Sequence, residues 1–290
     1  MEKNVLHYFV DTNSSRGFVS FWESNFGKLE KVVKLDGYPD LLVTQLVSQA
    51  CAQALGCEQE VELVHNCLDN SLQGIILPGQ KTGLLNLPAY GDESYSLRLA
   101  EDENLSKARE RVQRAYGCFG QALKIHDDWE RIFISSMDFE AMDELAEETA
   151  EKLFGGQKTD RAGSCADRFF GAATVNGSYD YIPNITQEIP KRYFLKGRPG
   201  TGKSTFLKML ARAAQDRGYR TEAYHCAFDP NSLDMIAVRE LGLCVFDSTA
   251  PHEYFPDRDS DEIIDIYKAA VQPGTDEKYE KEIAGYSAGY

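Results

Sequence analysis

Residues 192–205 read Arg-Tyr-Phe-Leu-Lys-Gly-Arg-Pro-Gly-Thr-Gly-Lys-Ser-Thr, and this stretch decides the fold of the chain. From Gly197 to Ser204 it matches the phosphate-binding loop (P-loop) pattern G-x-x-x-x-G-K-[ST] at every fixed position. The apolar run before the loop predicts a short buried strand, and the segment from Ser204 to about Arg217 predicts a helix that Gly218 ends. The apolar face of this helix consists of Phe206, Leu207, Leu210, Ala211 and Ala214.

Each residue type in this loop has a chemical reason to be there. Glycines allow backbone N–H groups to curl around phosphate oxygens, and the N-terminus of the following helix adds partial positive charge. Lys203 would reach the β- and γ-phosphates, and the Ser204 hydroxyl would bind Mg²⁺. We therefore expect ATP and Mg²⁺ as ligands. The expected nucleotide-binding residues are Gly197, Arg198, Pro199, Gly200, Thr201, Gly202, Lys203, Ser204 and Thr205.

A second apolar run, Leu241-Gly-Leu-Cys-Val-Phe-Asp247, predicts a strand that ends in a carboxylate. This is the form of a Walker B strand, whose aspartate holds Mg²⁺ directly or through water. We therefore expect Asp247 to act in catalysis with Lys203, and to share the metal with Ser204.

Four further polar residues lie at or near predicted strand ends, where the ligand-facing residues of α/β sheets collect. Asp229 is the third catalytic candidate, for contact with magnesium, water or substrate. His225 and His252 are candidates for substrate contact only. A zinc site built from these residues and Cys226 is disfavoured.

The composition bounds the class of protein. The 290 residues predict about two domains. A formal net charge of −15 disfavours general affinity for nucleic acid or anionic membranes. Seven scattered cysteines without any C-x-x-C indicate free thiols in a reducing cytosol. The N-terminus lacks the apolar run of a signal peptide, and no stretch approaches a membrane span, so we expect a cytoplasmic protein.

The sequence also repeats itself weakly at a constant offset of 160 residues, which indicates an internal duplication. The segment Val32–Pro39 resembles Arg192–Pro199. The matching positions are Gly37 with Gly197, His65 with His225, Asp69 with Asp229 and, after one inserted residue, Asn70–Leu72 with Asn231–Leu233.

In the first repeat the phosphate-binding residues are replaced. Leucine and valine cannot cradle phosphate and no lysine remains, although Thr44 could stand in for Ser204. Asn86 likewise stands where the second repeat has Asp247. We therefore interpret the first repeat as a degenerate P-loop domain that is kept for packing or regulation. The loop replacements are Asp40, Leu41, Leu42 and Val43 for Gly200, Thr201, Gly202 and Lys203.

The predicted fold class is α/β, with two tandem P-loop NTPase-like α/β/α domains. Each domain would have a parallel-rich sheet flanked by helices. Apolar spacing predicts one helix from Leu105 to Phe133 and a second from Asp138 to Phe154, paired as an antiparallel hairpin between the domains. The expected boundaries are residues 1–100 for the degenerate domain, 101–155 for the hairpin, 156–168 for a linker and 169–290 for the intact domain.

Three local expectations complete the reading of the second half. The segment Arg168–Thr174 predicts a strand, and Glu262–Ala270 predicts a helix after an acidic surface loop. The second repeat lacks a counterpart of the helical hairpin, so we expect it to be C-terminally truncated. Within the first helix, His126-Asp-Asp-Trp-Glu130 could form a metal cluster, but a solvated helix end is favoured.

Taken together, these motifs resemble an uncharacterised bacterial family of tandem P-loop ATP-binding proteins, found mainly in Firmicutes. The resemblance covers nearly the whole chain and rests on residues 192–204, 225–234, 246–254 and 125–130. It implies two P-loop domains, each followed by helices, with ATP binding and hydrolysis, and it names no substrate. The degraded first loop and the missing C-terminal helices depart from the family pattern.

Three functions fit these residues. The favoured one is an ATPase that couples hydrolysis to a conformational change, with Arg16 as a speculative arginine finger if the repeats form an intramolecular pseudo-dimer. The second is a phosphotransferase that acts on a small molecule or nucleoside. The third is a non-hydrolysing, nucleotide-gated scaffold whose degenerate first repeat binds an unknown protein partner.

Overall fold

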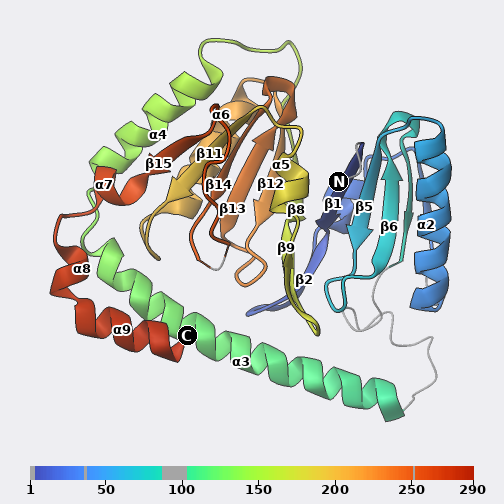
Figure 1. Ribbon diagram of the computed structural model, residues 1–290, viewed down its shortest axis with the longest axis horizontal. Helices are drawn as coiled ribbons and strands as arrows, with labels where there is room; N and C mark the ends of the chain where they lie inside the picture. The colour runs from blue at the N-terminus through green and yellow to red at the C-terminus, as the bar shows by residue number, and fades with distance from the viewer. Residues whose placement is uncertain (1–3, 36–37, 87–102, 251) are drawn as a thin grey trace. The chain divides into compact units, whose positions relative to one another are not determined.

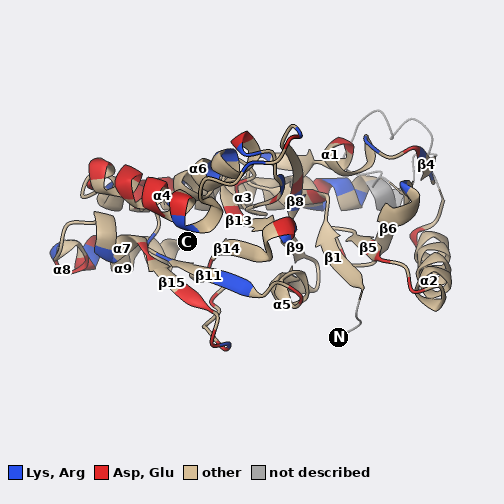
Figure 2. Cartoon of the chain, turned by 90° about the horizontal axis from the view of Figure 1, so that it is seen from above, with Lys and Arg blue, Asp and Glu red and all other residues tan. Residues whose placement is uncertain are grey.

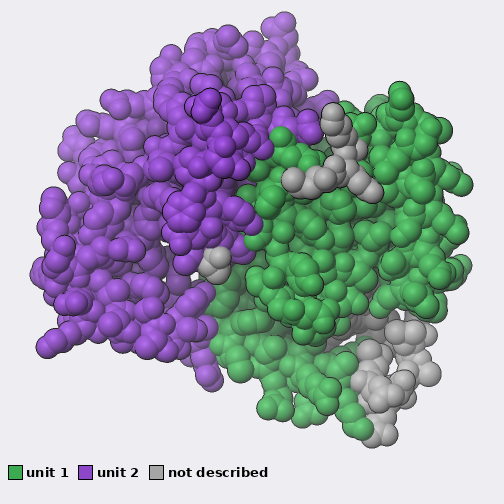
Figure 3. Space-filling model, in the orientation of Figure 1, with its two compact units in different colours: residues 1–119, 167–187, 227–230 green, residues 120–166, 188–226, 231–290 purple. Residues whose placement is uncertain are grey.

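The computed structural model describes residues 4–35, 38–86, 103–250 and 252–290, with the side chains of residues 103–105 left aside. Gly37 and Pro251, which belong to the motifs quoted above, lie outside these residues. The chain forms two compact units (Figure 3). Unit 1 comprises residues 1–119, 167–187 and 227–230, and unit 2 comprises residues 120–166, 188–226 and 231–290. No helix in the described part of the chain is long and apolar enough to cross a membrane.

Unit 2 contains a mixed sheet whose strands follow the order β15-β11-β14-β13-β12 (Figure 1). The first three of these strands run parallel to one another, and the last three form antiparallel pairs. Because β11 and β14 are parallel neighbours, their carboxyl ends meet at the same edge of the sheet. The bounds are β11 Lys191–Lys196, β12 Arg220–His225, β13 Leu233–Val238, β14 Leu243–Asp247 and β15 Glu262–Asp265.

Helix α6 (Lys203–Asp216) packs on β12, β13 and β14, and α4 (Phe139–Phe154) packs on α6. The five apolar residues predicted for one face of α6 are all buried, which confirms that prediction. The outer face of α4 carries Glu140, Asp143, Glu144, Glu147, Glu148 and Glu151, and Figure 2 shows these acidic residues along the helix. The core of unit 2 thus lies between the amphipathic helix α6 and the strands of the sheet.

One sequence-based expectation for unit 2 is wrong. The first four residues of the helix predicted from Glu262 form strand β15, because this segment pairs in parallel with β11, and only Ile266–Ala270 is helical (α7). Helix α4 packs against α6 and α7, and the helix before it in the sequence is α3 (Glu103–Ile134). Two helices end the chain, α8 Thr275–Lys278 and α9 Glu280–Gly289.

In unit 1 the strands follow the order β8-β1-β5-β6-β7-β4, with both parallel and antiparallel pairs. Helix α2 packs on β5 and β6 through Val43, Val47 and Ala54, which are buried against Val61 and Ile75. The bounds of its N-terminal elements are β1 Val5–Phe9, β2 Asp11–Ser14, β3 Gly17–Ser20, α1 Trp22–Phe26, β4 Lys31–Lys34, α2 Asp40–Gly56, β5 Val61–His65, β6 Leu72–Leu77 and β7 Thr82–Leu85.

The remaining elements of unit 1 come from the second half of the chain. Strand β8 (Ser164–Phe169) begins in the predicted linker, and its residues from Asp167 onward belong to unit 1. The strand predicted at Arg168–Thr174 is therefore divided between β8 and a separate hairpin. That hairpin and the helix after it are β9 Gly171–Thr174, β10 Gly177–Asp180 and α5 Ile182–Thr186.

The elements of the second half recur in the order of the first. Strands β8 to β14, with α5 and α6 among them, correspond one by one to β1 to β7 with α1 and α2. The offset is 160 residues up to β5 and β12, and 161 residues from β6 and β13 onward. Even the register shift between β5 and β6 recurs between β12 and β13. This agreement supports the duplication inferred from the sequence.

Within unit 1, equivalent residues of the two repeats meet in a symmetric way. Phe9 pairs with Phe169, its own counterpart, where β1 and β8 run antiparallel. Ser15 at the tip of the β2–β3 hairpin donates its N–H to Phe228 O at 3.0 Å. Val175 at the tip of the β9–β10 hairpin donates in the same way to Leu68 O at 2.8 Å. Each hairpin thus contacts a loop of the other repeat, and unit 1 is not the contiguous domain expected at residues 1–100.

Candidate functional site

The glycine-rich loop in unit 2 follows β11 directly and leads into α6. Gly200 and Gly202 adopt positive φ angles of 77° and 78°, which side chains disfavour. A Cβ on Gly197 would lie 2.4 Å from Thr201 Oγ1. The buried Thr201 hydroxyl donates to Arg198 O at 2.8 Å and closes the turn. These glycines are therefore required by the backbone of the loop, as its sequence predicts.

Lys203 begins α6 and faces the end of the neighbouring strand. Its Nζ donates to Arg198 O at 3.1 Å and lies 3.5 Å from Asp247 Oδ2. The other carboxylate oxygen of Asp247 accepts from Thr249 N at 3.0 Å and from Thr249 Oγ1 at 2.6 Å. Because Leu195 pairs with Asp247 across the parallel strands, the loop and the carboxylate emerge side by side. The structure thus brings the two predicted residues together.

Asp234 is a functional candidate that sequence reasoning missed. It lies in β13, directly after Leu233, whose N–H donates to Ser204 Oγ at 2.9 Å. Burial and the neighbouring Asp247 carboxylate raise the pKa of Asp234 to about 6, against a hydrogen bond from the Cys226 thiol. The repeat carried a signal that could have found it, because the first repeat has Gln73 at this position, as it has Asn86 opposite Asp247.

The donor set suits a hard divalent cation. The Ser204 hydroxyl and the carboxylates of Asp234 and Asp247 supply oxygen ligands, which Mg²⁺ prefers together with waters and phosphate oxygens. Two carboxylates close enough to raise a pKa repel each other, and a bound cation would relieve that repulsion. These residues fit the metal that the P-loop pattern implies.

Three of the other predicted loop residues have peripheral positions. Arg198 is exposed, and its guanidinium pairs with Asp276, with Nη2 at 3.0 Å from Oδ2. Thr205 is exposed on the first turn of α6, and Pro199 is partly buried in the loop. Their side chains do not add to the charged cluster around Lys203.

The remaining candidates are divided between the units. Asp229 belongs to unit 1, where its Oδ1 lies 2.6 Å from Arg16 Nε at the tip of the β2–β3 hairpin. His225 ends β12 at a register shift of the ladder. His252 lies close enough for its charge to lower the pKa of Asp234. Asp229 and Arg16, both predicted to act on ATP, are thus paired with each other.

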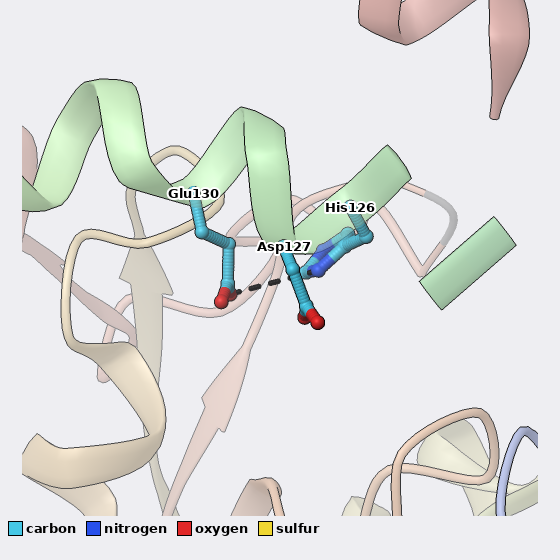
Figure 4. Close-up of side chains that lie close together, drawn as sticks. All are labelled: His126, Asp127 and Glu130. Carbon is cyan, nitrogen blue, oxygen red and sulfur yellow. Dashed lines mark ion pairs between the residues drawn. The ribbon is translucent and has the colours of Figure 1, made fainter. Parts of the chain in front are cut away.

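Helix α3 reaches the P-loop through Glu130. A Cβ on Gly200 would lie 2.4 Å from the Glu130 carbonyl oxygen, so the backbone of α3 lies directly against the loop. His126, Asp127 and Glu130 form a close cluster, with His126 Nδ1 3.6 Å from Glu130 Oε1 (Figure 4). Asp127 is exposed, and exposed acidic groups of this kind are common without an ion. At Glu130 the backbone of this segment contacts the loop, and the side chain keeps 35% of its surface exposed.

The first repeat shows what the replacements do. Val43, the counterpart of Lys203, is buried in the core of unit 1 with 1% of its surface exposed. Asn86 Nδ2 donates to Asp40 Oδ1 at 3.3 Å. The counterparts of these two residues in the second repeat are Asp247 and Gly200. Gln73 Nε2 donates to Asp11 Oδ2 at 2.8 Å. Neutral amides and a buried valine thus stand where the second repeat has two carboxylates and a lysine.

No protein-family model matches the chain, and neither the curated proteins nor the solved structures yield a match.

Proposed function

We propose that the second repeat binds MgATP at residues 197–204 and hydrolyses it, with a conformational change of the chain coupled to the reaction. One observation carries this proposal: Lys203, Ser204, Asp234 and Asp247 converge where a glycine loop with positive φ angles enters the N-terminus of α6. A positive charge, oriented N–H groups and paired carboxylates are the groups that phosphoryl transfer requires.

The residues of the chain would act mainly through electrostatics. The loop N–H groups and Lys203 would stabilise negative charge on the phosphate oxygens as water attacks the γ-phosphate. Lys203 would then exchange its present contact with Asp247 for the β- and γ-phosphates. Ser204, Asp234 and Asp247 would hold Mg²⁺, directly or through water. The cation, when bound, would neutralise charge on the phosphate oxygens.

The first repeat would not hydrolyse ATP, because its loop lacks the lysine and its strand-end carboxylates are amides. Its symmetric contacts with the second repeat in unit 1 support a pseudo-dimer of one active and one degenerate repeat. We therefore keep, as a proposal, membership of the tandem P-loop family that residues 192–204 resemble. The seven free cysteines favour a reducing compartment such as the cytoplasm.

Steady-state ATP turnover with Mg²⁺ tests the proposal, using the wild-type chain and Lys203→Ala. We expect turnover to fall about 100-fold or more in the variant, because a charge that stabilises the transition state is lost. Lys281→Ala is the matched control: Lys281 is an exposed lysine of α9, and its loss should leave turnover unchanged.

ATP binding, measured in parallel by calorimetry, separates the alternatives. If the wild-type chain binds ATP without turnover, and Lys203→Ala abolishes that binding, the nucleotide-gated scaffold would replace hydrolysis as the proposed function. Turnover that appears only when a small-molecule or nucleoside acceptor is added would favour the phosphotransferase. Absence of ATP binding by the wild-type chain would refute the central proposal.

A further inference from the structure

The first repeat holds a buried carboxylate at a position where the second repeat has glycine. Asp11 begins strand β2 and has no exposed surface, and its counterpart Gly171 begins β9. Gln73 on β6 is also buried, with 2% of its surface exposed. Its Nε2 donates to Asp11 Oδ2 at 2.8 Å. The two side chains therefore lie together in the interior of unit 1.

Each of these side chains has an oxygen atom without a hydrogen-bond partner. Among the residues that the structure describes, neither Asp11 Oδ1 nor Gln73 Oε1 accepts a hydrogen bond. The amide of Asn13, on the same face of β2 as Asp11, is committed elsewhere: it accepts from Tyr116 OH at 2.7 Å and donates to Cys67 Sγ at 3.3 Å. Because buried acceptors without a donor are unfavourable, this pair of oxygens is suited to bind a donor or a cation.

The charge of Asp11 favours a cation over a neutral donor. Burial raises the pKa of Asp11 to about 6, which still leaves most of the carboxylate ionised at pH 7. Within the described ranges, no lysine, arginine or histidine pairs with Asp11. Buried charges in proteins are paired with an opposite charge or bind a metal ion. A neutral donor would satisfy the oxygen atoms but leave the negative charge without a partner.

The second repeat shows which charge the first repeat has lost. Lys203 Nζ lies 3.5 Å from Asp247 Oδ2, so a positive charge stands beside a carboxylate there. In the first repeat the buried Val43 takes the place of Lys203. One carboxylate and one neutral amide oxygen match a monovalent cation, since a single positive charge neutralises Asp11. A divalent ion would leave a net charge buried in the interior, which is costly.

We propose that unit 1 binds an alkali metal cation, Na⁺ or K⁺, with Asp11 Oδ1 and Gln73 Oε1 among its ligands. The ion supplies a positive charge to the first repeat, as Lys203 does to the second. The degenerate repeat is thereby stabilised by a cation and needs no nucleotide. This inference does not depend on ATP binding, because it rests on residues of unit 1 alone.

Thermal unfolding of the full chain, with a chelator and without nucleotide, tests the site. At constant ionic strength, tetramethylammonium chloride is replaced stepwise by NaCl and, in a separate series, by KCl. The methyl groups of tetramethylammonium keep its charge away from oxygen ligands. We expect the Tm of the wild-type chain to rise by about 3–5 °C for each tenfold increase in the bound ion above its Kd. The series with the larger rise identifies the preferred ion.

Two variants assign the effect. Asp11→Asn should be more stable than the wild-type chain in tetramethylammonium chloride, because it buries no charge, and its Tm should not depend on Na⁺ or K⁺. Glu147→Gln is the matched control, because Glu147 is exposed on α4 and its loss changes the net charge equally. It should respond to the ions as the wild-type chain does.

Two outcomes would overturn the cation site. Equal Tm values of the wild-type chain in all three salts would show that no alkali ion binds, and would leave a neutral donor at Asp11. An equal response of Asp11→Asn would assign the effect to the salts themselves. Neither outcome bears on ATP binding by the second repeat, which is measured separately.

Discussion

Asp11 is a carboxylate without exposed surface, and its Oδ1 has no hydrogen-bond partner among the described residues. Burial raises the pKa of Asp11 to about 6, although hydrogen bonds from Gln73 and Cys67 oppose the shift. The folded state therefore binds this proton more tightly than the unfolded state does. The contribution of Asp11 to the free energy of unfolding should therefore decrease as pH rises from about 4 to about 6. Above about pH 6 it should stay at the lower value.

We expect Asp11→Asn to be more stable than the wild-type chain at pH 7, by about 1–3 kcal/mol. The amide carries no charge to bury, and it adds a donor close to Gln73, whose Oε1 also has no partner in the described part of the chain. Urea unfolding from pH 4 to pH 8 measures this, and the difference should vanish near pH 4. Equal or lower stability of the variant at pH 7 would contradict the argument; Glu147→Gln controls for net charge.

Two residues near the loop, Asp234 and Glu130, were not placed there from the sequence, for a shared physical reason. Asp234 is a single polar residue in an otherwise apolar strand, and only tertiary contacts bring this strand to Ser204 and the Asp234 carboxylate near Asp247. Glu130 lies far from the P-loop in sequence, within a helix of ordinary amphipathic pattern. The loop itself was predictable because its glycines, lysine and serine are consecutive, so that local geometry alone fixes their relation.

At the scale of elements, a buried ion pair attaches the loop after β14 to the strand that precedes the P-loop. Arg192 Nε on β11 donates to Asp261 Oδ1 at 2.9 Å, and Asp257 N donates to Asp261 Oδ2 at the same distance. The Asp261 side chain has no exposed surface. Burial alone would raise its pKa, but Arg192 and the N–H groups of residues 257 and 258 outweigh it and lower the pKa to about 2.

We expect Asp261→Asn to lower the free energy of unfolding by about 2–4 kcal/mol, because it removes the buried charge partner of the Arg192 guanidinium and leaves only the exposed Asp257 carboxylate. In the wild-type chain, this contribution is present above about pH 4 and is lost as pH falls toward 2, since the folded pKa is lowered. Thermal unfolding at pH 7 checks the first statement. Asp259→Asn, an exposed change in the same loop, is the control; a similar loss there would rule out the ion pair as the cause.

The elements also show where sequence patterns stop being informative. Strand β11 and helix α6 were predictable because each carries its own apolar pattern and start or stop residues. Residues 262–265 were predicted as helix but form a strand, because an open edge of β11 was available to pair with them. The division of residues 164–174 into β8 and β9 likewise depends on contacts with the first repeat.

At the scale of the whole molecule, unit 1 needs segments from both repeats. Phe9 and Cys67 share a small core with Phe169 and Ala172. Arg168 stacks on Tyr8, with its guanidinium carbon 4.0 Å from the ring centroid, and forms an ion pair with Glu62 at 2.9 Å. The sequence predicted contiguous domains because repeats usually fold as contiguous pieces, and nothing in the local pattern shows that the hairpins are exchanged.

We expect a fragment of residues 1–155 to unfold without a cooperative transition, whereas the full chain unfolds cooperatively. The fragment lacks residues 167–187, and loss of the Phe169 contact alone exposes the fully buried Phe9. Circular dichroism during heating, with near-ultraviolet spectra at 25 °C, measures the difference. A fragment with the cooperative transition and aromatic signals of a packed domain would refute the requirement for the second repeat.

Because unit 1 is made of segments from both repeats, it cannot be completed during synthesis until the last of these segments has left the ribosome. Residues 1–119 leave the ribosome first, but the unit is complete only after residue 230 has been made. At about 5–20 residues per second, residues 120–230 take roughly 6–22 s to synthesise. During that interval β1 has an unpaired edge and Phe9 lacks its partner. The nascent chain is then at its most prone to aggregation, and a chaperone that shields β1 would act in those seconds.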